Sequence, residues 1–423
     1  MNLIERRQRL LGRHVTTFYR DPVAPVQAKG VWLYDAQGNA YLDCYNNVPH
    51  VGHCHAHVVD AIARQAATLN THTRYVHEGI LQYGERLTSK FNHDLSSMIM
   101  MNSGSEANDV ALRMAQAMSG HTGIIGTDNT YHGNTAAVSQ LNATKLPVGG
   151  YQDHVRQVPA PDNMHPIGGS RAAQAEAFTA GVEAAIAELQ QSGHGVSALI
   201  ICPYFANEGF PTLPSGFLDQ AIAAVRRAGG LIISDEVQPG FGRLGSHWWG
   251  HERLGFAPDI VTLGKPMANG HPVAAAVTRL EVLECFQDAF KYFNTFGGNP
   301  VSAAAALATL EVIEADNLPQ NAYDVGNYAL EQLQQLANRH DVIADLRGAG
   351  LFFGVELMRD GQPATALADE MVNAMRNRRV LTSTVGRYDN TLKIRPPCVF
   401  SRENVDHLVE VMDSAFTEVL AGA

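Results

Sequence analysis

The sequence predicts an α/β protein built on a mainly parallel sheet, followed by a smaller α+β domain. Short apolar runs alternate with Ala-rich helical patterns up to about residue 300, and the pattern then changes. The 423 residues, 45% of them apolar, are enough for two domains with a substantial core. We expect residues 1–54 to pack with the small domain, residues 55–300 to form the large domain and residues 301–423 to form the small C-terminal domain.

Five short apolar runs predict strands of the large-domain sheet. These runs are Ser97–Met101, Thr122–Gly126, Ser197–Cys202, Gly230–Glu236 and Asp259–Gly264. The Ala-rich segments between them include two helical patterns, Ala172–Gln191 and Phe217–Arg227. This alternation is typical of parallel strands that are covered by helices on both faces.

Both ends of the chain depart from this alternation. The segment Gly30–Cys44 contains two alternating apolar patterns around an Asp-Ala-Gln-Gly-Asn turn, which predicts a hairpin outside the parallel sheet. From about Val301 a long Ala-rich helix precedes helical patterns mixed with "GLFFGVEL" and "TLKIRPP". These mixed elements predict the α+β character of the C-terminal domain.

The composition narrows the possible functions. An excess of 42 acidic over 31 basic side chains gives a formal charge of −11, which opposes a broad binding surface for nucleic acid or anionic membrane. The first residues lack the pattern of a secretion signal, and no run approaches about eighteen apolar residues. The five cysteines are scattered without a C-x-x-C pair, so neither a disulfide framework nor a cysteine zinc site is indicated. We therefore expect a cytoplasmic enzyme that acts on a small molecule.

Polar residues directly after three apolar runs predict a ligand site, because ligands of parallel sheets bind beyond the carboxyl ends of the strands. Gly104 permits a sharp turn before a helix, whose free N–H groups beside Ser105 suit a phosphate. Asp235 emerges from a buried strand, where a carboxylate needs a cation or strong donor. Lys265 follows another strand, between a glycine and a proline.

Each group also has a structural interpretation. Ser103 and Glu106 have capping-box spacing, so the helix start could be an ordinary cap, and Asp235 could cap a helix or form an internal ion pair. Together, however, a phosphate cradle, a buried acid and a lysine match pyridoxal 5'-phosphate. Its aldehyde condenses with a lysine, its ring nitrogen pairs with an acid and its phosphate needs anchoring. Lys265 is also a candidate general base, because the substrate displaces it from the cofactor and frees its amine.

Five blocks resemble the signature blocks of class III pyridoxal-phosphate aminotransferases, in order and at suitable spacing over nearly the whole chain. They are "NSGSEAN" (Asn102–Asn108), "TYHGNT" (Thr130–Thr135), "SDEVQPGFGRLG" (Ser234–Gly245), "GKPMANGHP" (Gly264–Pro272) and "FNTFGGNP" (Phe293–Pro300). The resemblance implies a fold-type I homodimer with active sites at the subunit interface. It also makes residues 55–300 the cofactor-binding domain.

The resemblance implies roles for single residues around the cofactor ring. Lys265 would be the Schiff-base lysine and Asp235 the partner of the ring nitrogen, so these two residues are the expected catalytic pair. Val237 would pack on one face of the ring and Tyr131 on the other, with His132 beside it.

The same resemblance implies the remaining cofactor contacts. Gln238 would hydrogen-bond the ring hydroxyl. Gly104 and Ser105 would hold the phosphate through the helix start, and Thr295 would reach that phosphate from the other subunit. The cofactor site is therefore expected to need two copies of the chain.

Four further segments are similar to one branch of the family, the ethanolamine-phosphate phospho-lyases and their phosphohydroxylysine relatives. They are Cys44–Ala61, Leu69–Leu87, Gly264–Ala274 and Leu381–Pro397. This likeness implies elimination of phosphate from phosphoethanolamine or a related amino phosphate, giving an aldehyde, ammonia and phosphate. Asn47 and Arg395, which lie in these segments, are assigned to substrate binding.

One departure from the aminotransferase pattern bears on the reaction. Many class III aminotransferases carry E-P-x-x-G-E where this chain has "CPYFAN", Cys202–Asn207, although Glu208 sits one position later. In those enzymes the second Glu can pair with a C-terminal arginine, which we match to Arg395. With Asn207 in place of that Glu, Arg395 would remain available to grip a substrate phosphate. A structural ion pair is the alternative role for Arg395.

Two other motifs are weaker. The segment Gly240–Gly245 fits G-x-G-x-x-G but opens no evident helix, so a dinucleotide site is disfavoured. The histidines His50, His53, His55 and His57 lack H-E-x-x-H spacing and a convincing carboxylate set, so we predict no metal site.

Two other functions remain open. An ω-amine or alanine:glyoxylate-type transaminase is the main alternative to a lyase. The other is a cofactor-binding regulatory or scaffold protein without turnover. Lys265, Asp235 and Gln238 together argue against that second alternative, because binding alone needs no electron sink and base.

Overall fold

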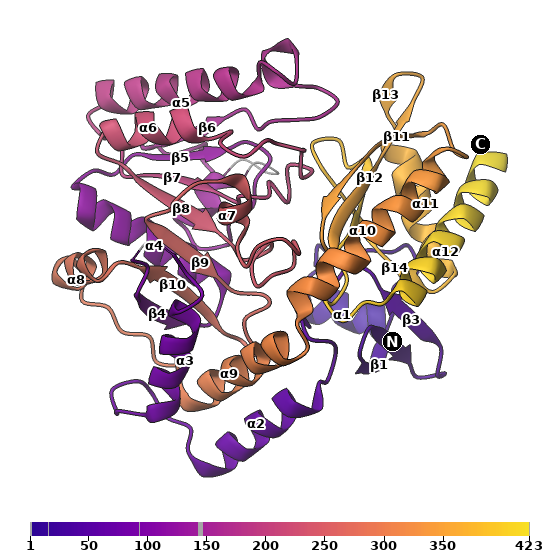
Figure 1. Cartoon of the computed structure of the whole chain (residues 1–423), viewed down its shortest axis with the longest axis horizontal. Coiled ribbons are helices and arrows are strands. Elements are labelled where there is room, and N and C mark those ends of the chain that lie inside the picture. Colours follow the sequence, from indigo (N-terminus) through magenta and orange to yellow (C-terminus); the bar gives the residue numbers. More distant parts are fainter. Residues whose placement is uncertain (1, 16, 93, 143–146, 423) are drawn as a thin grey trace.

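The computed structural model describes residues 2–15, 17–92, 94–142 and 147–422. Figure 1 shows one body of helices around a twisted sheet and, beside it, a second body formed by the two ends of the chain. The helix α9, Pro300–Ala315, lies at the base of the first body, and α10, Leu318–Ala337, leads into the second.

The first body is organised by a seven-stranded sheet of order β4-β10-β9-β8-β7-β5-β6. Its strands are β4 (Ser97–Met101), β5 (Ile124–Thr127), β6 (Val155–Val158), β7 (Ala198–Ile201), β8 (Leu231–Asp235), β9 (Ile260–Leu263) and β10 (Ala274–Thr278). Strand β10 runs antiparallel to both neighbours, β4 and β9, while the pairs from β9 to β6 are parallel. The mainly parallel sheet is thus confirmed. Four of the five predicted runs contain a strand, and the fifth, Thr122–Gly126, overlaps β5.

Helices cover both faces of this sheet. They are α4 (Gly104–Ser119) and α8 (Leu280–Ala289) on one face, and α5 (Gln174–Gln191) and α6 (Asp219–Arg227) on the other. Ile200 and Ile233 pack in the cluster under α4 and α8, whereas Leu199 and Ile232 pack under α5 and α6. Because successive side chains of a strand point to opposite faces, strands covered on both sides are apolar at every position.

The second body contains an antiparallel sheet of order β11-β12-β16-β15, with β13 paired to β12. The strands are β11 (Ile343–Ala349), β12 (Phe352–Arg359), β13 (Gln362–Pro363), β15 (Ser383–Val385) and β16 (Thr391–Ile394). Two helices, α11 (Thr365–Asn377) and α12 (Arg402–Ala421), accompany it. The expected C-terminal α+β arrangement is therefore present.

The N-terminal segment joins this second body. The predicted hairpin is formed by β2 (Trp32–Asp35) and β3 (Ala40–Asp43), with β1 (Pro25–Lys29) on its outer side. Strand β14 (Val380–Leu381) pairs with β3 in parallel, which ties residues 25–43 to the C-terminal part. The boundaries at residues 54 and 300 stay a prediction.

Shorter and peripheral helices complete the chain. They are α1 (Leu3–Leu11), α2 (Ala56–Thr68), α3 (Glu78–Thr88), α7 (Gly250–Leu254) and the 3₁₀ turns Val138–Leu141 and Ile167–Gly169. Helices α2 and α3 pack against α9, which therefore contacts the first body. Helix α1 buries none of its side chains.

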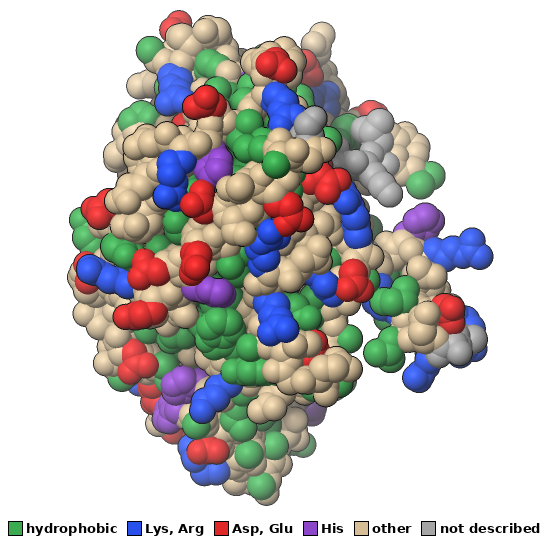
Figure 2. Space-filling model, turned by 90° about the vertical axis from the view of Figure 1, so that its right-hand side faces the viewer, with side chains coloured by type: hydrophobic (Ala, Val, Ile, Leu, Met, Phe, Trp, Pro, Cys, Tyr) green, Lys and Arg blue, Asp and Glu red, His purple; other side chains and the backbone are tan. Residues whose placement is uncertain are grey.

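The surface carries both acidic and basic side chains. Figure 2 views the right-hand side of Figure 1 and shows acidic and basic side chains interspersed over that face. Over the ranges that the structure describes, no helix combines the length and the apolar character needed to cross a membrane. The five cysteines are free, and Cys44, Cys202 and Cys398 are buried.

Candidate active site

The carboxyl ends of β8 and β9 place Asp235 and Lys265 in one pocket. The two strands are parallel neighbours, with Asp235 beside Thr262 and Lys265 three positions further along. Both side chains line a pocket of about 200 Å³, which we call the strand-end pocket. Its other lining residues include Gly104, Ser105, Tyr131, His132, Val237 and Gln238. The geometry therefore assembles every predicted cofactor contact except Thr295.

The Asp235 carboxylate is held by three donors. His132 Nδ1 lies 2.7 Å from Asp235 Oδ2, Asn108 Nδ2 donates to the same oxygen at 2.9 Å, and the Val237 N–H donates to Oδ1 at 3.0 Å. Asn108 is itself oriented, because its Oδ1 accepts a hydrogen bond from Thr262 Oγ1 at 2.6 Å. A buried carboxylate needs such donors, and here they also fix its direction.

The start of α4 forms the phosphate cradle of the strand-end pocket. The Ser103 hydroxyl accepts from the Glu106 N–H at 3.3 Å, but the Glu106 carboxylate accepts from the Asn102 N–H at 3.0 Å, so the capping box is only half formed. A Cβ on Gly104 would lie 2.9 Å from the Val237 side chain, so glycine keeps the helix start open. The first N–H groups of a helix lack intrahelical partners and bind anions.

The surroundings of Lys265 disfavour the charged form of its amine. Burial lowers the pKa of Lys265, the positive charge of Arg395 lowers it further, and Asp235 opposes both effects. A larger fraction of the amine is then neutral, which makes it a better nucleophile toward a carbonyl and a better base. The pocket thus tunes Lys265 for the chemistry that the sequence predicts.

A second, larger cavity of about 1180 Å³ opens beside the strand-end pocket and shares Lys265 with it. We call it the cationic cavity, because Lys265, Arg387, Lys393 and Arg395 line it. Arg387 is half exposed and paired with Asp128 at 2.6 Å, so its charge is already compensated. The two deeper cations, Lys393 and Arg395, are 5% and 4% exposed.

Arg395 has only neutral partners among the described residues. Its guanidinium donates to Gln238 Oε1 and to the Tyr45 carbonyl at 3.3 Å, and it lies 5.3 Å from the Tyr45 ring centroid. Burial lowers the pKa of Arg395 to about 10. No carboxylate of the described chain forms an ion pair with it, which is contrary to the alternative of a structural ion pair.

A second cation, Lys393, faces Asn207 in this structure. Lys393 Nζ lies 3.4 Å from Asn207 Oδ1, while the contacts of Arg395 are to Gln238 and Tyr45. Lys393 was missed by the sequence analysis. The signal was the alternation in "LKIRPP", because residues two apart on a strand point to the same face and Arg395 follows Lys393 by two.

Glu208 does not replace the missing partner of the cavity cations. Its carboxylate accepts from Thr127 Oγ1 at 2.7 Å and from the Asn207 N–H at 3.1 Å, pointing away from Arg395. Burial raises the pKa of Glu208. The position one residue after Asn207 therefore supplies no ion pair to Arg395.

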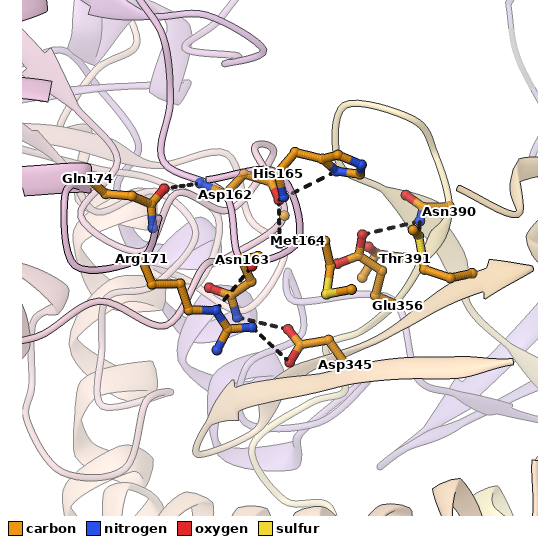
Figure 3. Close-up of polar contacts among 12 residues, drawn as sticks. Asp162, Asn163, Met164, His165, Arg171, Gln174, Asp345, Glu356, Asn390 and Thr391 are labelled. Carbon is orange, nitrogen blue, oxygen red and sulfur yellow. Dashed lines mark hydrogen bonds and ion pairs between the residues drawn. The ribbon is translucent and has the colours of Figure 1, made fainter. Parts of the chain in front are cut away.

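A polar network fixes the loop that carries Asn207. Figure 3 shows Asn163 and Arg171, from the segment after β6, pointing toward Asp345 of β11. Asn163 Nδ2 donates to Asp345 Oδ2 at 2.8 Å, and Asn163 Oδ1 accepts from the Thr212 N–H at 3.0 Å. Arg347 of β11 donates to the Gly209 carbonyl at 2.6 Å. The C-terminal sheet thus holds residues 209–212, directly after Asn207.

Two predicted site residues lie outside both cavities. Thr295 is exposed on the loop before α9 and lines neither cavity of this chain. Asn47 is buried, and its Nδ2 donates to the Gln238 carbonyl at 3.4 Å. From the same segment, Tyr45 rather than Asn47 lines the cationic cavity. The predicted contacts of Thr295 and Asn47 with ligands stay predictions.

Three of the four clustered histidines form contacts with other residues of the chain. His50 Nε2 lies 2.9 Å from the Phe241 carbonyl, His53 pairs with Asp43 at 2.7 Å and His57 pairs with Glu311 at 2.6 Å. A search of the described part of the chain finds no group of three or more side chains arranged to hold a metal ion.

Comparison with known proteins decides the family. The model of the class III aminotransferases matches residues 16–416. The chain belongs to this family. Class III enzymes have the fold-type I architecture and depend on pyridoxal 5'-phosphate, which is therefore the cofactor of this chain.

The relatives of this class III chain carry names for two activities. A Drosophila melanogaster protein named alanine–glyoxylate aminotransferase 2-like is 40% identical over 99% of this chain and 88% of its own length. A Caenorhabditis elegans protein named ethanolamine-phosphate phospho-lyase homolog 1 is 34% identical over 98% and 93%. An Arthrobacter phospholyase solved with phosphoethanolamine superimposes with a TM-score of 0.94, at 44% identity over 98% of this chain and 99% of that one.

The strand-end pocket of this class III chain fits the cofactor. Asp235 would hold the ring nitrogen, the start of α4 at Gly104 would hold the phosphate, and Lys265 would bind the aldehyde. Val237 and Tyr131 line the space for the ring, while His132 supports Asp235 from behind. When bound, the cofactor supplies a carbonyl that captures the substrate amine and a ring that withdraws electrons.

Gln238, which is predicted to hydrogen-bond the ring hydroxyl of the cofactor, contacts other side chains in this structure. Its Oε1 accepts from Arg395 and from Lys393 Nζ at 3.3 Å, and its Nε2 lies 3.4 Å from Asn207 Oδ1. Gln238 also lines both cavities, so it lies between the cofactor site and the buried cations.

Proposed function

We propose that this chain is a phospho-lyase that eliminates phosphate from phosphoethanolamine or a related amino phosphate. The observation that carries the proposal is the pair of buried cations in the cationic cavity, which has neutral partners and lies next to Lys265. A substrate amine in the strand-end pocket would place its phosphate beside Arg395. The Arthrobacter phospholyase solved with phosphoethanolamine supports this assignment.

The residues of the site account for each proton and bond of the elimination. Lys265 removes a proton from the carbon that bears the amine. Asp235 keeps the ring nitrogen of the cofactor protonated. The protonated ring withdraws electrons and so favours removal of the proton from the substrate carbon. The C–O bond to the phosphate then breaks, and the phosphate leaves with the bonding electrons while Arg395 binds it. The leaving phosphate takes up the proton that Lys265 removed, which restores the lysine. The enamine product takes up water and gives acetaldehyde and ammonia, so no amino acceptor is consumed.

We further propose that the enzyme is a cytoplasmic homodimer, with Thr295 reaching the cofactor phosphate of the partner copy. The loop around Thr295 supports a partner surface, because Phe293 and Phe296 are 41% and 70% exposed. Tyr75 and Val76, in the loop before α3, are 65% and 94% exposed. Arg74 lies 3.9 Å from the Phe293 ring centroid, so the two loops meet. Exposed apolar groups of this kind are typical of protein interfaces.

The alternative is an aminotransferase, which the Drosophila relative's name favours. Purified holoenzyme should be incubated with phosphoethanolamine and no keto acid, and phosphate and acetaldehyde should be measured. A lyase releases both in equal amounts. Amine transfer that requires a keto acid, without phosphate release, would establish the aminotransferase instead. Cofactor binding without either reaction would indicate a binding protein.

A further inference from the structure

Lys393 is the cation that the reaction scheme above leaves unused. It lies on β16, and its Nζ donates to the Ala206 carbonyl at 3.1 Å and lies 3.3 Å from Gln238 Oε1 and 3.4 Å from Asn207 Oδ1. All three partners are neutral oxygen atoms. Within the described ranges, no carboxylate is paired with Lys393, although its side chain is 5% exposed and lines the cationic cavity.

Two buried cations that line one cavity and have no ion-pair partner are costly for a protein. Burial and the charges of Arg395 and Lys265 together hold the pKa of Lys393 well below its usual value. Arg387, which lines the same cavity, differs from these two cations, because it forms an ion pair with the Asp128 carboxylate at 2.6 Å that compensates its charge. The deep part of the cavity is therefore arranged for a ligand that brings two negative charges.

We propose that Lys393 is a specificity-determining residue which binds the doubly charged phosphate of the substrate together with Arg395. Asn207 sets this specificity, because its neutral amide oxygen at 3.4 Å leaves the charge of Lys393 uncompensated, where a carboxylate would neutralise it. The inference rests on the proposed function, since it names the group that recognises the substrate. The two cations differ in their contribution. Arg395 offers a planar fork of donors, and Lys393 offers a compact charge with three donors.

Binding of inorganic phosphate to the holoenzyme tests this subsite without turnover, because the cofactor already fills the other phosphate site. Isothermal titration calorimetry should compare wild-type protein with Lys393→Met and Asn207→Asp. We expect each variant to bind phosphate roughly 10- to 100-fold more weakly, the range for loss of a charge-assisted hydrogen bond. Lys393→Arg should recover most of the affinity.

Arg387→Met is the matched control, because it removes a cation of the same cavity whose charge Asp128 already compensates. Its phosphate affinity should stay within about threefold of wild type, as for a surface ion pair. Thermal unfolding of each holoenzyme would separate loss of the subsite from loss of the fold. If Lys393→Met fails to fold, Asn207→Asp carries the test, because aspartate has nearly the size of asparagine.

The phosphate-binding measurements test the role of Lys393, and phosphate release from phosphoethanolamine tests the proposed function. Phosphate binding that Lys393→Met and Asn207→Asp leave unchanged would overturn the inference, and so would an equal loss in Arg387→Met or no binding to wild type. A subsite that behaves as expected in an enzyme that releases no phosphate from phosphoethanolamine would instead contradict the proposed function.

Discussion

The strand-end pocket and the cationic cavity share Lys265 but are built in different ways. The strand-end pocket takes Asp235 and Lys265 from neighbouring strands of one sheet, and His132 and Asn108 complete the hydrogen bonds of Asp235. The cationic cavity takes its deep charges from Lys393 of β16 in the other sheet and from Arg395 directly after that strand. The two sites differ in how their charges are compensated, because Asp235 is held by three donors whereas Lys393 and Arg395 have no ion-pair partner among the described residues.

Replacing Lys265 should give the largest effect and abolish the function of both sites. Lys265→Ala removes the base and the covalent link to the cofactor, so we expect turnover to fall by at least about 10³-fold. The cofactor should be partly retained through the start of α4. Borohydride reduction of yellow wild-type protein, followed by peptide mapping, should place the adduct on Lys265. An adduct on another lysine, or a colourless protein that takes up no cofactor, would contradict the assignment.

Replacing Asp235 should damage the strand-end pocket alone. Asp235→Asn preserves size but cannot keep the ring nitrogen protonated, so we expect kcat to fall on the order of 10²-fold with little change in thermal stability. Phosphate binding in the cationic cavity should persist. Kinetics and thermal unfolding of the same preparation would check this, and wild-type turnover in the folded variant would refute the role of Asp235.

Replacing Arg395 should damage the cationic cavity alone. Arg395→Ala should raise KM for the phosphorylated amine, because losing one partner of a buried charged contact costs about 2–5 kcal/mol. Arg395→Lys should recover only part of this loss, since a point charge cannot reproduce the planar fork. Steady-state kinetics with and without the phosphate group on the substrate would measure the effect. An equal change for both substrates would argue against a phosphate contact.

A change of pH should separate the two deep cations. Lys393 faces Arg395, Lys265 and the buried Glu208, and the cations help to hold its pKa below the usual value. It loses its proton as pH rises through that lowered pKa, so phosphate affinity should fall several-fold there while Arg395, with a pKa of about 10, stays charged. Lys393→Arg should move the fall to higher pH. Phosphate titrations at increasing pH, kept below the pKa of Arg395, would check this, and identical profiles for wild type and Lys393→Arg would exclude Lys393 as the group.

The smallest effect is expected at the proposed subunit contact. Thr295→Ala should weaken retention of the cofactor several-fold, the loss of one neutral hydrogen bond, and should leave the fold of each subunit intact. Cofactor dissociation and solution mass would be measured together. A monomeric protein with full activity would show that neither pocket needs a second copy.

Much of the large-domain fold was predictable because its signals are local. The apolar runs that became β4, β7, β8 and β9 were recognisable from length and composition. Strand β10, Ala274–Thr278, was missed, since three of its five residues are alanine, which is depleted in strands. Its burial comes from its strand neighbours β4 and β9 and from α4, which packs on it, and no local pattern reveals these contacts.

In the candidate site, too, some residues could be assigned from the sequence and others only from the tertiary structure. Asp235, Lys265 and Gly104 could be assigned from the sequence alone, because each directly follows a strand and parallel strands end at the same edge. The contact between Asn207 and Lys393, which are 186 residues apart in the chain, was not predicted. That contact depends on how β16 docks against the loop after β7, and this docking is set by packing and by hydrogen bonds such as Arg347 to Gly209. Sequence order fixes which side chains alternate along a strand, but only the packing of the two sheets decides which of them faces Asn207.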